Sequence, residues 1–304
     1  MGLIHVFSVG VILNPFQMVA ALVGAKILLN LVPIVIKLAE ANVWTIGIFR
    51  LFFTCLFFAL ITKKSFYLRL KKTWILGVIF FVHWLTYFIG VKSGDPSATV
   101  IGLCFYGLIL MVYSRVFQGK KMERKYFLGV LFSIFGTYLA VGDFDLGNEN
   151  FIGFLWGVAS ATAYAFLPIF HQRNLHISTQ DRAYSQFLGA FVLFLILGWQ
   201  NFDLDFGDYT TLSALAYLTV GGTILGHTLW VKITEQLETR ITSCIYYVSV
   251  PISMLFERIF LGVPLTGEKL MGGLIILIAN VFVVYKPKRS KMIPAQKAPV
   301  TDCN

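Results

Sequence analysis

The chain has 304 residues, of which 57% are hydrophobic and only 13% are charged, and phenylalanine alone occurs 29 times. A soluble domain carries roughly 25% charged residues, so this composition excludes a soluble two-domain enzyme. Lysine and arginine exceed the acidic residues, which gives a net charge of +10. In a soluble protein this excess would indicate nucleic acid or another anionic partner. In a membrane protein it reflects topology, and the positions of the charges decide between the two interpretations.

Ten apolar runs, each close to the length of a membrane span, follow one another along the chain. A transmembrane helix needs about 20 mostly apolar residues, and the loops between the runs are short, so the helical bundle itself must carry the function. The runs lie at 16–38, 43–62, 74–92, 97–117, 126–142, 151–172, 182–200, 211–233, 241–262 and 267–286. Residues 1–15 are too short to span, which predicts either an interfacial segment or an extension upstream of a start at Met18.

Lysine and arginine gather in alternate loops, as they do on the cytoplasmic side of membrane proteins. The second and fourth loops are basic, with Lys63 and Lys120 among others, whereas the fifth and seventh carry acids such as Asp145 and Asp205. This pattern predicts a multi-pass protein of the inner (plasma) membrane with both termini in the cytoplasm. The tail, 287–304, is predicted to be a disordered basic end near anionic lipid and not a nucleic-acid arm.

The sequence contains an internal repeat. A shift of 144 residues places the third to fifth runs over the eighth to tenth and aligns His83 with His227. Each half, 16–142 and 151–286, then has five spans, and because five is odd the second half enters the membrane from the opposite side. The predicted fold is therefore an all-α membrane protein of ten transmembrane helices, arranged as two inverted five-helix repeats.

Three stretches of this sequence carry a family resemblance. The first is the part of the second run that contains Arg50. The third and fourth runs contain the stretch HWLTYFIGVKSGDPSATVIGL, and the ninth and tenth contain SVPISMLFERIFLGVPLTGEKLMGGLIIL. Together with the layout of two times five spans, they resemble the EamA-type members of the drug/metabolite transporter superfamily over residues 17–286.

The two halves match the family's repeat unequally. In the second half Pro251 and Glu257 stand where the family's repeat has its proline and glutamate, whereas Gly107 and Tyr113 replace them in the first half. The resemblance implies transport of small metabolites such as amino acids, without ATP hydrolysis. It also implies a central cavity lined by helices three, four, eight and nine, joined by one and six.

Lys26 is a charged residue well inside the first predicted helix, with Asn30 one turn further on the same face. A charge at mid-bilayer costs about 2.5–3.5 kcal/mol on insertion scales, so it requires a partner, a wet cavity or a function. Lys26 is expected either to meet an anionic group of a substrate or to extend toward the membrane interface.

Arg50 lies seven residues into the second helix, and Glu257 lies at a similar predicted depth near the outer end of the ninth. An arginine keeps its proton, so a carboxylate or several carbonyls must satisfy it. Glu257 is therefore a candidate partner for Arg50, which is expected to act in a structural clamp or, alternatively, as a gate charge on the outer side.

The matched histidines, His83 and His227, both fall near the middle of their helices. A pseudo-two-fold axis would bring them to comparable depths on opposite walls of one cavity. There they serve either ligand contact and proton coupling or hydrogen bonding between helices. A metal site is not expected, because neither helix has further ligands at useful spacing.

Tyrosine and tryptophan residues in mid-helix differ from the many phenylalanines, because each carries a polar atom that needs a partner. An aromatic cavity built from them suits amphipathic solutes, although some of them can equally pack between helices. The candidates are Trp84, Tyr87, Tyr106, Tyr164, Trp230 and Tyr246.

These features together predict a secondary active transporter that moves a small organic metabolite, such as an amino acid, across the inner membrane by alternating access, most simply as an exporter. The expected partners are the substrate, the lipid bilayer and protons, in a monomer or weak dimer. No phosphate-binding loop or metal-ligand spacing occurs, so no cofactor is predicted. The alternative is a membrane-embedded enzyme acting on lipid or isoprenoid substrates.

Overall fold

The computed structural model describes residues 13–61, 66–119, 125–142, 144–174, 176–177, 179–237, 245 and 247–284. Within this part the regular elements are helices. They are α2 (Pro15–Leu38), α3 (Val43–Ile61), α4 (Phe66–Ser93), α5 (Pro96–Cys104), α6 (Tyr106–Gln118), α7 (Lys125–Val141), α8 (Glu149–Tyr164), α9 (Phe166–Arg173), α10 (Thr179–Gly198), the short η1 (Trp199–Asn201), α11 (Tyr209–Tyr217), η2 (Leu218–His227), α12 (Thr228–Gln236), α14 (Ser249–Leu261) and α15 (Gly267–Val284).

Seven helical segments among the described residues are long and apolar enough to cross a membrane. They are Pro15–Leu38, Val43–Leu60, Thr73–Ser93, Pro96–Phe117, Glu149–His171, Asp181–Asn201 and Tyr209–Thr234. Each coincides with a predicted run. The three remaining runs correspond to α7, whose apolar part Leu128–Val141 is shorter, and to α14 and α15, which are not among the seven. The predicted terminal segments fall almost entirely outside the described residues.

Capping residues set the helix ends on the loop side. Asn14, Asn148 and Asp208 each accept hydrogen bonds from backbone N–H groups of the turn that follows. Gly119 and Gly262 end α6 and α14 with φ of +67° and +70°, a left-handed conformation that glycine adopts without steric cost. Because these signals are local, the helix boundaries follow closely from the sequence.

Two of the membrane segments are bent in the middle. Phe105 separates α5 from α6 and Ala165 separates α8 from α9, and the N–H of Phe105 donates to Gly102 three residues back. Pro168 follows the second bend, and its ring nitrogen cannot donate to Tyr164. Both bends therefore leave irregular backbone in the interior of the bundle, which membrane proteins tolerate where it is buried or lines a cavity.

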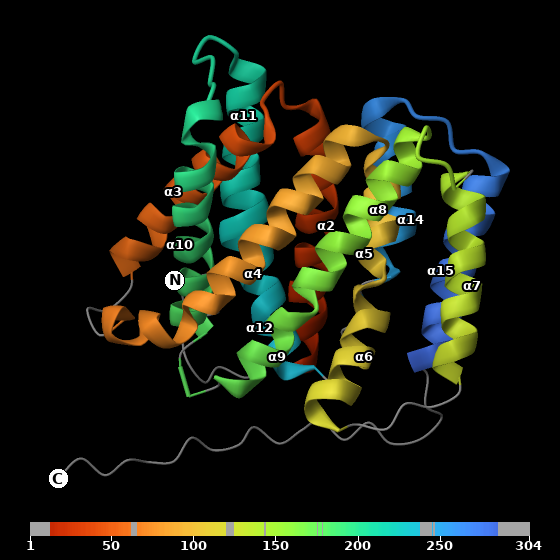
Figure 1. Cartoon of the computed structure of the whole chain (residues 1–304), viewed down its shortest axis with the longest axis horizontal. Helices are drawn as coiled ribbons and strands as arrows, with labels where there is room; N and C mark the ends of the chain where they lie inside the picture. The colour runs from red at the N-terminus through yellow and green to blue at the C-terminus, as the bar shows by residue number, and fades with distance from the viewer. Residues whose placement is uncertain are drawn as a thin grey trace.

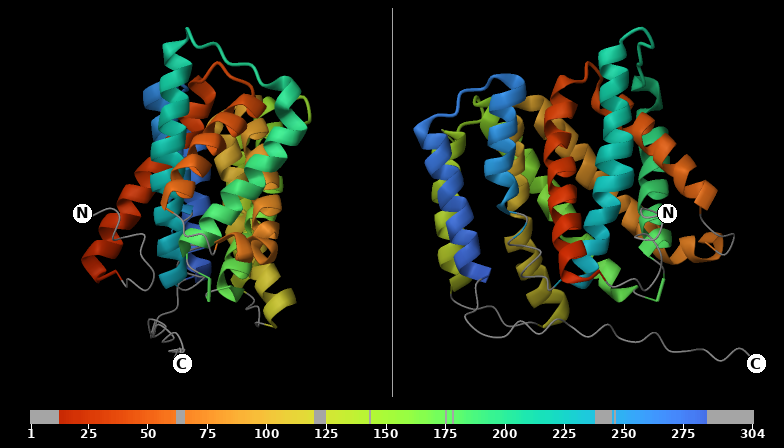
Figure 2. Two further views of the ribbon diagram at one scale, coloured as in Figure 1. Left: turned by 90° about the vertical axis from the view of Figure 1, so that its left-hand side faces the viewer. Right: turned by 180° about the vertical axis from the view of Figure 1, so that it is seen from behind.

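The helices form one bundle with a separate pair at one edge. α4 packs on α8 and α10, α5 on α8, and α2 on η2 and α14. α7 and α15 lie side by side at the edge (Figures 1 and 2), in close approach at Gly136 and Gly272. The interior between α2, α3, α4, α8 and η2 holds the cavities described below.

The loops that join α2 to α3, α7 to α8, α10 to α11 and α14 to α15 all lie at one end of the bundle, at the top in Figure 1. We call this the upper end and the opposite one the lower end. The acidic residues Asp145, Asp203 and Asp205 lie in upper-end loops, whereas Arg115 and Arg173 lie near the lower ends of α6 and α9.

Candidate functional site

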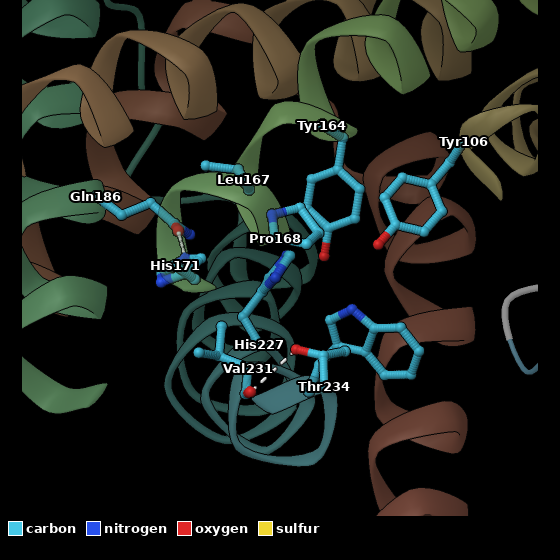
Figure 3. Close-up of a pocket in the computed structure, with 10 residues that line it drawn as sticks. Tyr106, Tyr164, Leu167, Pro168, His171, Gln186, His227, Val231 and Thr234 are labelled. Carbon is cyan, nitrogen blue, oxygen red and sulfur yellow. Dashed lines mark hydrogen bonds between the residues drawn. The ribbon is translucent and has the colours of Figure 1, made fainter. Parts of the chain in front are cut away.

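Two adjoining cavities lie inside the bundle. The upper cavity is lined by Leu29, Val32, Arg50, His83, Trp84, Tyr87, Leu103, Tyr164, His227 and Trp230. The lower cavity, drawn in Figure 3, is lined by Tyr106, Tyr164, Leu167, Pro168, His171, Gln186, His227, Trp230, Val231 and Thr234. Tyr164, His227 and Trp230 border both, so the two cavities lie on either side of these three side chains.

Both cavities are narrow. Their volumes are about 50 Å³ for the upper and about 20 Å³ for the lower one, and a water molecule needs roughly 10–15 Å³ of such space. A few waters fit, but an organic metabolite does not. A solute of that size can therefore enter only if the surrounding helices move apart.

Arg50 is the charged residue of the upper cavity, and its side chain is 1% exposed. Its guanidinium carbon lies 3.9 Å from the centre of the Trp84 ring, and Nε donates to Thr223 Oγ1 over 2.5 Å. A desolvated cation–π contact contributes about 2 kcal/mol or more, which is comparable to the cost of inserting the charge. Nη2 has no hydrogen-bond partner among the described residues.

The backbone of η2 is shaped to receive this guanidinium. η2 has π-helical hydrogen bonding, and Thr223 Oγ1 donates to Leu218 five residues back. A Cβ atom on Gly222 would lie 2.9 Å from Arg50 Nη2 and 2.8 Å from Val32, so only glycine lets the arginine lie this close. π-helical turns are rare and frequently mark functional sites.

His83 is held in one orientation by Ser160. Its Nδ1 lies 2.7 Å from Ser160 Oγ, and that hydroxyl donates over 2.9 Å to the His83 carbonyl. Because Ser160 has a single hydrogen, Oγ accepts from Nδ1, and Nε2 of the neutral ring is then an acceptor. The imidazole stacks on Tyr164 at 4.3 Å.

His227 lines both cavities, and its ring contacts Phe80 and Trp84 with centroid distances of 5.4 and 5.7 Å. Neither ring nitrogen has a hydrogen-bond partner among the residues that the structure describes. The matched histidines of the two halves thus border one cavity. One is fixed by a serine, and the other is surrounded by aromatic rings.

Lys26 and Asn30 do not line either cavity. Lys26 Nζ donates to Ser249 over 2.9 Å and lies 4.6 Å from the centre of the Trp230 ring. Asn30 donates to the Lys26 carbonyl of its own helix over 2.7 Å. Lys26 therefore ties α2 to α14, with one aromatic ring of the cavity beside it.

The predicted pairing of Arg50 with Glu257 is wrong. Glu257 accepts from Lys269 Nζ over 2.7 Å and from the N–H and hydroxyl of Ser97, and Asp95 lies 3.2 Å from the same ammonium. α14 and α15 meet at a short upper-end loop, which brings Lys269 to Glu257, whereas Arg50 points toward η2. Sequence reasoning missed Lys269, although the two residues flank this loop closely.

The aromatic candidates divide between the two cavities. Trp84 and Tyr87 line the upper one, Tyr106 the lower one, and Tyr164 and Trp230 both. Tyr246 lies outside the described residues. Three further polar residues of the lower cavity, His171, Gln186 and Thr234, were not predicted. His171 Nε2 lies 3.1 Å from Gln186 Oε1 (Figure 3). His171 and Thr234 lie near the ends of α9 and α12, where polar residues are common, so their positions in the sequence carry little signal.

Residues 151–285 match the EamA-like transporter family, and this segment coincides with the second predicted repeat. The second half of the chain is therefore similar to EamA-type members of the drug/metabolite transporter superfamily. The resemblance found in the sequence is thereby confirmed, and the protein is a multi-pass membrane protein.

Two relatives accompany this family match. The uncharacterized transporter YvbV of Bacillus subtilis (strain 168) is 24% identical over 237 residues, which cover 74% of this chain and 76% of that protein. A solved crystal structure, described only as that of a protein, superposes with a TM-score of 0.64 at 14% identity, over 88% of this chain and 96% of that one. The second similarity concerns the fold alone.

The upper cavity is lined by a different set of helices from the one that the resemblance implied. Helices one, three, four, six and eight contribute as expected, through α2, α4, α5, α8 and η2. The second helix, α3, adds Arg50. Helix nine contributes no described residue to either lining.

Proposed function

We propose that this protein is a secondary active transporter, which exports a small organic solute across the inner membrane by alternating access. The family and the name of the Bacillus relative support a membrane transporter. The observation that carries the mechanism is the central cavity, which lies between the halves and is lined by Arg50, His83 and His227. Arg50 Nη2 has no hydrogen-bond partner among the described residues.

The pattern of helix contacts supports ten spans in two inverted halves. α4 packs on α8, and their counterparts, η2 and α2, pack on each other; α5 packs on α8, and likewise α14 on α2. α3 with α10, α5 with α14 and α7 with α15 are contacts between counterparts themselves. A pseudo-two-fold axis in the membrane plane generates this set of pairs.

The upper end is closed by a cluster of Asp95, Ser97, Asn150, Glu257 and Lys269, the upper-end ion-pair cluster. It joins the start of α5, in the first half, to α8, α14 and α15 of the second. Alternating access requires these contacts to break when the upper end opens. With the acidic loops outside, the protein is in this state closed toward the exterior.

The proposed path continues in the other direction through the lower cavity, past Thr234, His171 and Gln186. The basic ends of α6 and α9 lie on this side, which we assign to the cytoplasm together with both termini. Solute would enter from the cytoplasm, reach the upper cavity and leave when the ion-pair cluster opens. Transport in this manner needs no subunit partner, so a monomer or weak dimer suffices.

Proton coupling would use the histidines. His83 and His227 line the same cavity and have ring nitrogens available to a proton, whereas Lys26 and Glu257 already bind Ser249 and Lys269. The variant His83→Asn should therefore change the pH dependence of transport more than the variant Lys26→Met does.

Purified protein in liposomes tests this proposal. Radiolabelled amino acids, organic acids, amines and neutral solutes are offered as a panel, with protein-free liposomes as control, and at least one solute should exchange faster with the protein present. An imposed pH gradient identifies proton coupling. If no solute of any class exchanges while the protein remains folded, the proposal is wrong; if a lipid or isoprenoid is chemically altered, the enzyme alternative replaces it.

A further inference from the structure

We infer that the upper cavity binds its solute as a monocarboxylate with an apolar, preferably aromatic body and no ammonium group, and that Arg50 Nη2 is the donor that recognises the carboxylate. This inference rests on the proposed transport function and names the substrate class of that site.

The arginine is prepared for an anion. Three contacts fix the plane of the guanidinium group. It lies over the Trp84 ring, Nε donates a hydrogen bond to Thr223, and Nη2 occupies the space left by the missing Cβ of Gly222. Arg50 lines the upper cavity, and its Nη2 is buried and has no hydrogen-bond partner among the described residues. A guanidinium held this way presents charged N–H groups to a planar acceptor, and carboxylates are the acceptors that match its geometry.

The charges around the cavity favour a single negative charge on the solute. Among the described residues that line either cavity, none is acidic, so a solute ammonium would find no carboxylate. Lys26 Nζ lies 4.6 Å from the centre of the ring of Trp230, a residue of the lining. Its charge adds to the positive electrostatic potential in the cavity. Arg50 is the single cation of the described lining, which suits a monoanion and not a doubly charged phosphate ester.

The remaining lining is apolar and aromatic. Trp84, Tyr87, Tyr164 and Trp230 surround the arginine together with Leu29, Val32 and Leu103. Aromatic rings favour a flat apolar body by stacking. The neutral His83 ring, fixed by Ser160, offers Nε2 as an acceptor, which suits a hydroxyl or amide N–H of the solute better than a second anionic group.

Four ligands with one phenyl body separate the charge classes: 3-phenylpropionate, 3-phenylpropanamide, phenylalanine and phenethylamine. Trp84 and Trp230 line the cavity, so quenching of tryptophan fluorescence in the detergent-purified full chain reports binding independently of transport. The anion should bind at least about tenfold more tightly than the amide, because a charge-assisted hydrogen bond is roughly twice as strong as a neutral one. The zwitterion and the amine should bind more weakly still.

Arg50→Met should weaken binding of 3-phenylpropionate by about 30-fold, since it removes a hydrogen bond to a charged group, and should change binding of the amide by less than about threefold. Arg115→Met, at an exposed arginine of α6, is the matched control and should change neither. Arg50→Lys retains the charge without the planar donor fork and should lose about tenfold.

Equal affinity for the anion, the zwitterion and the amine in the unsubstituted protein would overturn the inference without any variant, as would retention of anion binding in Arg50→Met. Failure of all four ligands to bind would also overturn it. Transport of some other solute from the liposome panel would then leave the proposed function intact, so the two failures are distinguishable.

Discussion

Lys269 and Arg50 are both buried cations, but their surroundings differ. Lys269 lies between the carboxylates of Glu257 and Asp95, at 2.7 and 3.2 Å. Arg50 lies on the ring of Trp84 with Nη2 unpartnered among the described residues. A fully paired charge fixes helices to one another, whereas a charge stabilised by an aromatic face keeps its capacity to bind an anion. Charge pairing therefore distinguishes the buried cation that joins helices from the one proposed to bind the solute.

The two proposed repeats differ at the position of Glu257. The shift of 144 residues aligns Glu257 with Tyr113. Tyr113 stacks on Phe166 at 4.1 Å and its hydroxyl donates to the Thr162 carbonyl over 3.3 Å. The second repeat thus uses a carboxylate to join helices at the upper end, and the first uses an aromatic contact at the corresponding place, so the two ends need not open with equal ease.

The largest effect is expected for Lys269→Met. It leaves Glu257, 1% exposed, buried without its lysine, and breaking a buried pair costs about 3–5 kcal/mol. Thermal unfolding in detergent measures the loss. Glu268→Gln, at the exposed neighbouring residue, is the control and should melt like the unsubstituted protein. The double variant Glu257→Gln, Lys269→Met should regain much of the stability; a single variant that melts normally would show that the pair is not structural.

The variant Ser160→Ala tests the hydrogen bond between His83 Nδ1 and the Ser160 hydroxyl. Ser160 is fully buried, and without it Nδ1 of His83 loses its partner, which costs about 1–3 kcal/mol. The same unfolding measurement detects this loss. Ser213→Ala, at an exposed serine of α11 that bonds only to its own helix, should change little. Equal stability of both variants would mean that the serine does not hold the histidine.

Gly222→Ala should affect binding more than stability. The new methyl group must displace Arg50 Nη2, which lies 2.9 Å from its position, while alanine adds about 1 kcal/mol of helix propensity that offsets part of the strain. We expect a several-fold weaker affinity for 3-phenylpropionate in the fluorescence assay. Gly24→Ala, where a Cβ meets nothing within 4 Å, is the matched control. An unchanged affinity would contradict the position assigned to the guanidinium.

The smallest effect concerns a solvent-accessible charge, Asp208, which caps α11. Hydrogen bonds from the Thr211 side chain and backbone, and from the Thr210 backbone, lower the pKa of this carboxyl below its usual value. A lowered folded-state pKa means that the cap stabilises above the unfolded pKa, about 3.9, and is lost as pH falls through the folded value. Asp208→Ala should speed hydrogen exchange in the first turn of α11 at neutral pH; faster exchange that persists unchanged in strong acid would rule out this role.

Much of the fold is readable from the sequence because its signals are local. Apolar length predicts the spans, and capping residues such as Asn14 and Asp208 mark where helices begin. Seven described membrane segments coincide with predicted runs. The shift of 144 residues also indicated that His83 and His227 border the same cavity, because residues matched by an inverted repeat lie at comparable depths about a pseudo-two-fold axis.

The partners of the buried charges are not local. Arg50 meets Thr223 across 173 residues, and Ser97 meets Glu257 across 160. Depth along a span can be read from sequence, but rotation about the helix axis and the identity of the facing helix cannot. For this reason Arg50 and Glu257, similar in depth, were matched with each other, although they face different helices.

The order of residues thus determined the membrane class, the seven described membrane segments, the resemblance to a transporter family and the distribution of charge between loops, since these depend on composition and spacing along the chain. The packing of α3 against η2 and of α14 against α15 determined which buried charge is neutralised by carboxylates and which has a donor without a described partner. Hydrogen bonds and ion pairs act over a few ångströms, so their pattern exists only after distant helices have come into contact.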